Sequence, residues 1–226
     1  MPLTESVYSY PPVLRDVLSH WEALETAIER AVFLKGDYKR ADQAADLLAL
    51  DTAIQAQEGL DNQRQLSAGQ RDAQKKALAL RADQFAKAVR AFAAGTPHEK
   101  ALPKKPAYTA IESKFERPMR DSADLWKRIE ADATLSSSVH PLVLAGGYTH
   151  AQFESDLVAL TASFRALEAA DRASREGRRR RDAPLRGLRE RVNQYRAAAQ
   201  ALLPEGHPLL TTLPVLSAPV SRRQQA

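Results

Sequence analysis

The sequence contains no cysteine, few aromatic residues, few glycines and no long apolar run. Without cysteine there is no disulfide framework, thiolate zinc site, iron–sulfur cluster or cysteine nucleophile. No stretch approaches 18 uninterrupted apolar residues, and the first residues lack the basic and apolar regions of a cleaved export signal. We therefore expect a cytoplasmic protein with no membrane partner.

The composition favours an all-α fold. Of the 226 residues, 44% are hydrophobic and 27% charged, which is enough apolar surface to build a core. Aromatic residues make up only 6%, and the long segments are rich in alanine, arginine, leucine and glutamine, which form helices rather than strands. The net charge of +5, from 33 basic and 28 acidic side chains, permits anionic partners without requiring them.

The most informative feature is an internal repeat. Residues 33–94 align without gaps with residues 143–204 at an offset of 110, with 19 identities in 62 positions. Upstream the offset is 105, which places Trp21 on Trp126 and implies a five-residue insertion at 136–140. Two alanine-rich helices could resemble each other by composition alone, but this does not readily explain the shared words. These are Leu34-x-Gly36-x-Tyr38 with Leu144-x-Gly146-x-Tyr148, and Arg71-Asp72-Ala73 with Arg181-Asp182-Ala183.

Each copy predicts the same three-helix unit. A short helix carrying the tryptophan, near 13–32 and near 117–135, follows Pro11-Pro12 in the first copy and Pro118 in the second. A glycine-containing connection leads to a long antiparallel helical hairpin, and we expect both tryptophans in the core. Thr149 with Gln152 predicts a capping box at the start of the second hairpin.

The hairpin arms carry apolar stripes at helical spacing. If each arm packs on its own returning arm, Leu47 lies opposite Val89 in the first copy, and Leu160 lies opposite Tyr195 in the second. The turns then fall near Ser67-Ala68-Gly69 and near Gly177.

The whole chain is thus predicted to be a six-helix bundle made by tandem duplication, with extended proline-rich segments. Its expected parts are an extended N-terminal arm (1–12), helical repeat 1 (13–106), helical repeat 2 (107–205) and an extended C-terminal tail (206–226). The tail is too apolar to float freely in water, so it docks either on its own chain or on a neighbouring one. Its candidate inter-chain contacts are Leu209, Leu210, Leu213, Val215 and Leu216.

One polar feature stands above background, an arginine-rich run at the predicted tip of the second hairpin. Guanidinium groups bind phosphates, carboxylates and acidic protein surfaces, so this run is a candidate contact for an anionic partner. Alternatively it is a solvated tip that nearby carboxylates neutralise in part. The candidate residues are Arg175, Arg178, Arg179, Arg180 and Arg181.

No motif indicates catalysis. The sequence has no phosphate-binding loop, no dinucleotide fingerprint and no Glu-x-x-His, so we expect no cofactor, no metal and no catalytic residue. A duplicated helical unit supplies two like surfaces, which suits assembly better than a single cleft. We expect a non-enzymatic scaffold or interaction protein with coiled-coil-like packing that binds protein and forms homo-oligomers. The alternatives are a nucleic-acid-binding protein that uses the arginine run, and an enzyme with an unrecognised site between the repeats.

Overall fold

A computed structural model describes residues 6–135 and 139–216. The two ends of the chain, 1–5 and 217–226, belong to the predicted arm and tail and lie outside the described residues. The same holds for 136–138, which form part of the predicted insertion.

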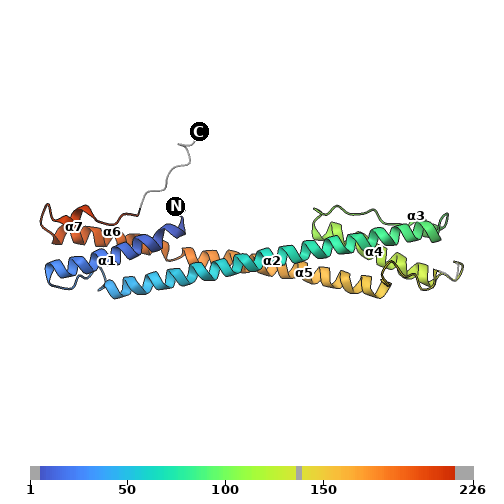
Figure 1. The fold of residues 1–226 in the computed structure, drawn as a ribbon, viewed down its shortest axis with the longest axis horizontal. Helices are drawn as coiled ribbons and strands as arrows, with labels where there is room; N and C mark the ends of the chain where they lie inside the picture. Colours follow the sequence, from blue (N-terminus) through green and yellow to red (C-terminus); the bar gives the residue numbers. More distant parts are fainter. Residues whose placement is uncertain (1–5, 136–138, 217–226) are drawn as a thin grey trace, which may run out of the picture. The chain divides into compact units, whose positions relative to one another are not determined.

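The described residues form helices and no strand, which confirms the all-α prediction (Figure 1). Two single β-bridges, Leu34 with Tyr38 and Leu144 with Tyr148, occur in loops. None of the described helices has the length and apolar character needed to cross a lipid bilayer. In chain order the elements are η1 (Val7–Ser9), α1 (Tyr10–Ile28), α2 (Arg40–Phe92), α3 (Pro97–Lys100), α4 (Glu112–Ala131), α5 (His150–Asp182), α6 (Leu185–Leu202) and α7 (Pro208–Thr211).

The predicted turn of the first hairpin is wrong, because α2 runs unbroken through Ser67, Ala68 and Gly69. Its 53 residues correspond to about 80 Å of helix at 1.5 Å per residue. The helix contains no proline, and a glycine inside a helix costs only about 1 kcal/mol relative to alanine. That cost is too small to stop a helix whose flanking turns are already formed.

The second predicted turn is also wrong, because Gly177 lies inside α5. The chain departs from helix later, at Ala183 and Pro184, where the first copy has Gln74 within α2. Proline lacks the N–H that would continue the helical ladder. Helical hydrogen bonds are present on both sides of this break. Ala183 N donates to Arg179 O at 3.0 Å before it, and Leu188 N donates to Pro184 O at 3.0 Å after it.

The prolines lie within helices more often than predicted. Pro11 and Pro12 occupy the first turn of α1, where a missing N–H leaves no bond unmade, so the described part of the predicted N-terminal arm is helical rather than extended. Pro118 lies inside α4, which begins at Glu112 and buries Phe115 before the proline is reached. The single-turn helices α3 and α7 each begin at a proline, and α7 lies within the tail that is predicted to be extended.

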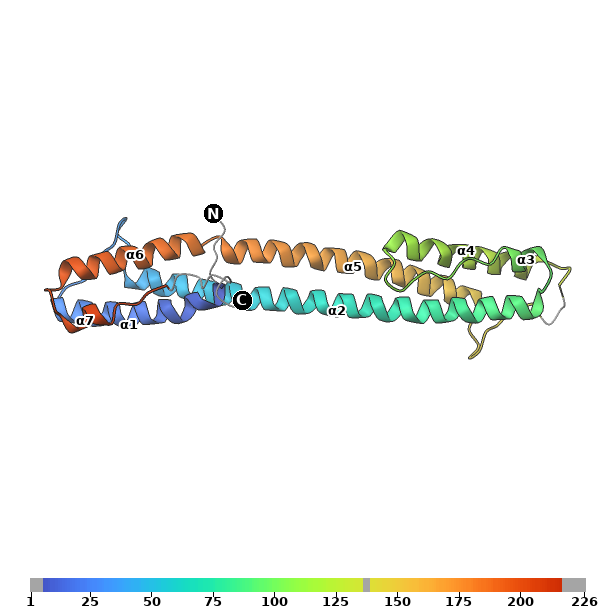
Figure 2. The same ribbon diagram turned by 90° about the horizontal axis from the view of Figure 1, so that it is seen from above.

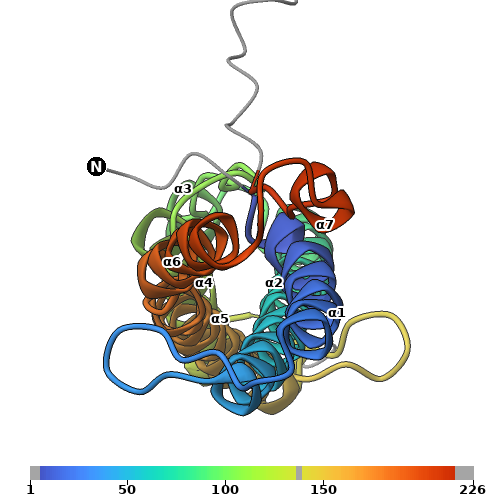
Figure 3. The ribbon, with the colours of Figure 1, turned by 90° about the vertical axis from the view of Figure 1, so that its left-hand side faces the viewer.

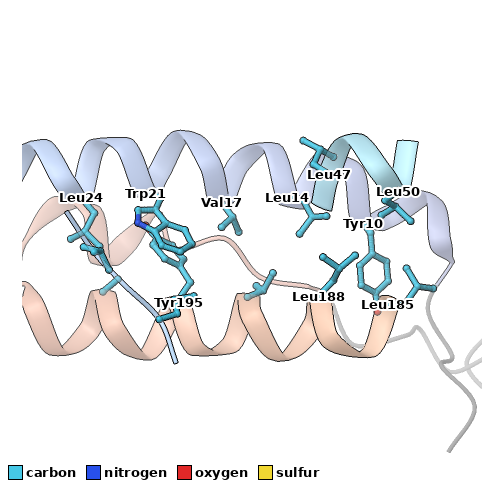
Figure 4. Packing of buried hydrophobic residues seen from close by; sticks show 14 of the residues in the cluster. Tyr10, Leu14, Val17, Trp21, Leu24, Leu47, Leu50, Leu185, Leu188 and Tyr195 are labelled. Atoms are coloured by element: carbon cyan, nitrogen blue, oxygen red, sulfur yellow. The ribbon is translucent and has the colours of Figure 1, made fainter. Parts of the chain in front are cut away.

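The chain divides into two compact units. Unit 1 comprises Met1–Leu60 and Ala173–Ala226, and unit 2 comprises Asp61–Arg172. In unit 1, α1 and α6 lie beside the first part of α2 (Figure 2), and Figure 4 shows their buried side chains meeting. This core includes Trp21 of α1, Leu47 of α2 and Tyr195 of α6. Four tail leucines pack against it: Leu209, Leu210, Leu213 and Leu216.

Unit 2 has a core of its own, formed by the second part of α2, α4 and the first part of α5. Phe85, Trp126 and Phe153 are buried in this core, one from each helix. Both tryptophans are fully buried, as predicted. The predicted pairing within each copy is wrong, since Leu47 and Val89 belong to different cores, as do Leu160 and Tyr195.

Candidate interaction surfaces

Each unit contains a stacked aromatic pair at its centre. In unit 1, Trp21 stacks on Tyr195 with ring centroids 4.8 Å apart. In unit 2, Trp126 stacks on Phe85, also at 4.8 Å. The tryptophans are aligned by the sequence repeat, and Phe85 and Tyr195 differ by its offset of 110. A stack with the same centroid distance is therefore made in each unit, by residues that the sequence alignment places at matching positions.

A glycine-containing loop precedes each long helix, and we call these loops the clamped loops: residues 34–38 in unit 1 and 144–148 in unit 2. Leu34 N donates to Tyr38 O at 2.8 Å, and Leu144 N donates to Tyr148 O at the same distance. Gly36 (φ +78°) and Gly146 (φ +80°) adopt the left-handed conformation that this tight turn requires and that glycine adopts without strain. Figure 3 shows the loop of unit 1 projecting from the helices around it.

An arginine fastens each clamped loop. In unit 1, Arg191 donates to the carbonyl of Lys35 at 2.6 Å, and its guanidinium carbon lies 4.4 Å from the ring centroid of Tyr38. In unit 2, Arg81 donates to the carbonyl of Ala145 at 3.2 Å and lies 4.3 Å from the ring centroid of Tyr148. Each guanidinium is held by both a hydrogen bond and a cation–π contact, so each loop is fixed at its base.

The tyrosines of the clamped loops are fixed in the same way. Tyr38 donates to Asp46 at 2.6 Å, and Tyr148 donates to Asp156 at 2.6 Å. Burial, followed by the hydrogen bond to the carboxylate, raises the pKa of both tyrosines well above the ordinary value. Both hydroxyls therefore remain protonated donors across the physiological pH range.

The capping box predicted for the second copy is confirmed. Thr149 N donates to Gln152 Oε1 at 2.8 Å, and Gln152 N donates back to Thr149 Oγ1 at 3.4 Å. At the start of α2, Lys39 N donates to Asp42 Oδ2 at 2.9 Å, which is half of the same arrangement. The complete box at Thr149 and the half box at Lys39 each begin a long helix directly after a clamped loop.

The predicted arginine contact lies in the last turns of α5, within unit 1. Arg178, Arg179 and Arg180 are exposed, and Arg180 also pairs with Glu176 at 3.1 Å. Arg175 is exposed as well, one turn earlier. Arg181 differs, because only 15% of its side chain is exposed and it pairs with Asp182 at 2.8 Å. Both the exposed basic surface and the partial neutralisation considered from the sequence are therefore present.

The five apolar tail residues proposed as inter-chain contacts differ in burial. Leu209, Leu210, Leu213 and Leu216 pack on the core of unit 1, whereas Val215 is exposed. The backbone is also held: His20 Nε2 lies 2.7 Å from the carbonyl oxygen of Leu209, which can only accept, so Nε2 carries the proton. The other ring nitrogen lies 2.5 Å from the hydroxyl oxygen of Tyr195.

Unit 2 contains a buried lysine that the sequence analysis missed. The Lys75 amine donates to the carbonyls of Tyr108 and Ala110 and lies 4.8 Å from the ring centroid of Phe115. Burial lowers the pKa of Lys75 below its ordinary value. At an offset of 110 the first unit has Leu185, also buried. Lys75 thus fastens the segment before α4 to α2, at a place where unit 1 uses apolar packing.

An exposed groove lies between α4 and α5 of unit 2. Its volume is about 600 Å³, and Ala123, Leu157, Val158 and Ala162 contribute its apolar lining. This surface is not evident from the sequence, because exposed and buried apolar residues on a helix look alike until the neighbouring helix is placed.

Within 6–135 and 139–216, no group of three or more histidine, aspartate and glutamate side chains gathers as a metal site would require. His150, which has Glu154 one turn later at 3.5 Å, lies 3.1 Å from the carbonyl of Ala123 through Nε2. No known family model, curated protein or solved structure matches this chain.

Proposed function

We propose that this protein is a non-enzymatic, self-assembling scaffold built by tandem duplication of one helical unit. The observation that carries the proposal is the recurrence of the arginine clamp: Arg191 holds the 34–38 loop, and Arg81 holds the 144–148 loop. Both arginines also contact a glutamine three residues later, Gln194 at 3.1 Å and Gln84 at 3.0 Å. Polar contacts of this detail do not recur at one fixed offset because of alanine-rich composition.

In this proposal, the two copies have exchanged the second halves of their long helices. Each unit combines the tryptophan helix and first long-helix segment of one copy with the returning segment of the other, as the Trp21–Tyr195 and Trp126–Phe85 stacks illustrate. A chain of this kind resembles a domain-swapped dimer joined end to end. Like units presented in one polypeptide suit repeated, symmetric contacts between chains.

Self-assembly predicts a mass that depends on concentration. We expect the weight-average mass, measured by sedimentation equilibrium or light scattering, to rise above the monomer value of 24.9 kDa as the protein is concentrated. A series from about 1 µM to about 1 mM covers the affinities expected of a reversible scaffold contact. A mass that stays at one chain over the whole series would refute self-assembly.

The exposed arginines at the end of α5 favour a second candidate function, nucleic-acid binding. Arg178, Arg179 and Arg180 are consecutive and exposed, and the side chain of Arg180 is 79% exposed. Contacts to phosphates release counterions, so the logarithm of the binding constant should fall linearly with the logarithm of salt concentration.

The test is a filter-binding titration with duplex and single-stranded nucleic acid at several salt concentrations. Replacing Arg178–Arg181 together by glutamine should weaken binding and reduce the salt slope, by about 0.7 to 0.9 for each phosphate that an arginine no longer neutralises. Gln70→Ala on exposed α2 is a control that leaves the arginines intact. No binding by the wild type at low salt would exclude this function.

A further inference from the structure

One apolar side chain that lines the groove between α4 and α5 is strongly exposed. Val158 is 71% exposed, and it lies about two turns inside the N-terminal end of α5. Leu157 next to it is half-buried and packs on the core of unit 2, so the groove has an apolar floor that the chain's own core supports. A single exposed valine is ordinary on a protein surface. Here, however, charged side chains of opposite sign lie on either side of it along α5.

Four residues of α5 form a seam along the groove: Glu154, Val158, Thr161 and Arg165. Three of them are exposed, whereas Thr161 is half-buried and donates to Glu116 Oε1 of α4 at 2.7 Å. All four line the groove, and their spacing of four, three and four residues is that of the contact positions in a coiled coil. The seam carries a negative charge at its beginning and a positive charge at its end. The two ends of the seam therefore have opposite charges, and an antiparallel copy of the same helix would place each end beside an end of the opposite charge.

The match is in register. In an antiparallel pair centred between Ala159 and Leu160, Glu154 of one helix faces Arg165 of the other, and Val158 faces Thr161. The same centre places Leu157 opposite Ala162, which pairs a large side chain with a small one. Every facing pair joins two positions of the same helix sequence, one from each copy. The surface is therefore complementary to itself.

We propose that α5 of unit 2 pairs antiparallel with α5 of a second copy of this chain, across a twofold axis at the centre of the seam. This inference rests on the proposed self-assembly and names its surface. Each dimer then contains two Glu154–Arg165 pairs flanking an apolar centre. Glu154 also has His150 at 3.5 Å on its own chain, and on α4 Arg120 pairs with Glu116 at 2.9 Å. Asp124 lies at the groove edge.

The aligned face of unit 1 lacks this self-complementarity. Its residues at the offset of 110 are Ala44, Leu48, Asp51 and Gln55, so both ends of the seam are uncharged. Asp51 is engaged by Arg15 at 3.0 Å. Leu48 is nevertheless 69% exposed, almost as much as Val158. Unit 1 thus offers a matched position with the same exposure and without the charge pattern.

Charge reversal on the full-length chain tests the proposal. Glu154→Arg gives a seam with two positive ends, and Arg165→Glu gives one with two negative ends, so each variant alone should associate at least about tenfold more weakly than the wild type. Mixed in equal amounts, the two variants should form a heterodimer, because every facing pair then has opposite charges. Association in the mixture should return to near the wild-type strength.

Two arginine substitutions at equally exposed positions control for nonspecific effects. Val158→Arg should weaken association at least about tenfold, whereas Leu48→Arg should leave it unchanged. Far-UV circular dichroism of each variant checks that the helices are retained. If the wild type associates but the charge variants and Val158→Arg associate equally well, this surface is wrong while self-assembly stands. A wild type that remains a monomer overturns both.

Discussion

Replacing Trp21 by alanine should lower the free energy of unfolding by about 3–5 kcal/mol, because the indole is fully buried and stacked on Tyr195. The informative quantity is its coupling to other rings. In a double-mutant cycle, Trp21→Ala and Tyr195→Ala should couple by about 1–2 kcal/mol, since their side chains touch. Trp21→Ala and Phe85→Ala should be additive, because these residues belong to different cores.

Urea unfolding followed by circular dichroism supplies the four free energies of each cycle. Trp126 and Phe85, stacked at 4.8 Å, provide the matched positive control in unit 2. Closed hairpins within each sequence copy would reverse the pattern, with coupling between Trp21 and Phe85 and none between Trp21 and Tyr195. That reversal would contradict the exchanged arrangement.

Introducing proline at Gln70 should destabilise the protein by about 3 kcal/mol or more. Gln70 is exposed and lies well inside α2, where proline removes a backbone hydrogen bond and clashes with the carbonyl four residues earlier. Gln70→Ala, which keeps the backbone intact, is the control. The midpoint of urea unfolding and the loss of helical ellipticity measure the effect.

A neighbouring substitution should act in the opposite direction. Gly69 has no positive φ, and a Cβ at this position meets no atom within 4 Å. Gly69→Ala should therefore stabilise the helix by about 0.5–1 kcal/mol. In a hairpin turn that used glycine in the left-handed conformation, alanine would instead be destabilising and proline nearby would be tolerated. Finding those signs would show that the chain turns at this point in solution.

The features predicted correctly depend on local sequence. The helical composition, the two buried tryptophans and the capping box at Thr149 all follow from neighbours a few residues away along the chain. Helix boundaries were less predictable, because proline is compatible with a first helical turn and the buried Phe115 extends α4 ahead of Pro118.

The partner of each long helix could not be predicted, for a reason that lies in the repeat itself. A tryptophan that needs an aromatic partner finds Phe85 in one copy and Tyr195 in the other, so closed and exchanged arrangements bury equivalent surfaces. Local patterns do not distinguish two arrangements with equivalent contacts. The difference lies in the connection, because Ser67, Ala68 and Gly69, where a closed hairpin would turn, are helical in α2.

The candidate surfaces could likewise be predicted only in part from the sequence. Arg81 and Arg191 are identical residues in the alignment, but the loop that each one clamps belongs to the other sequence copy. The charge order along α5 is visible in the sequence, yet only the placement of α4 shows that this face is uncovered. The buried Lys75 gave no signal, because its carbonyl partners lie 33 and 35 residues away.

The division of the chain between the units sets an order for folding during synthesis. Unit 2 is one continuous segment, Asp61–Arg172, and is complete before the last quarter of the chain leaves the ribosome. Unit 1 must wait, because His20 and Tyr195, which meet in its core, are 175 residues apart. Until α6 emerges, the apolar face of α1 lacks the side chains of α6 that complete its core, and it is open to chaperones or to a neighbouring nascent chain. Translation itself therefore makes the N-terminal helix the last long element to be covered.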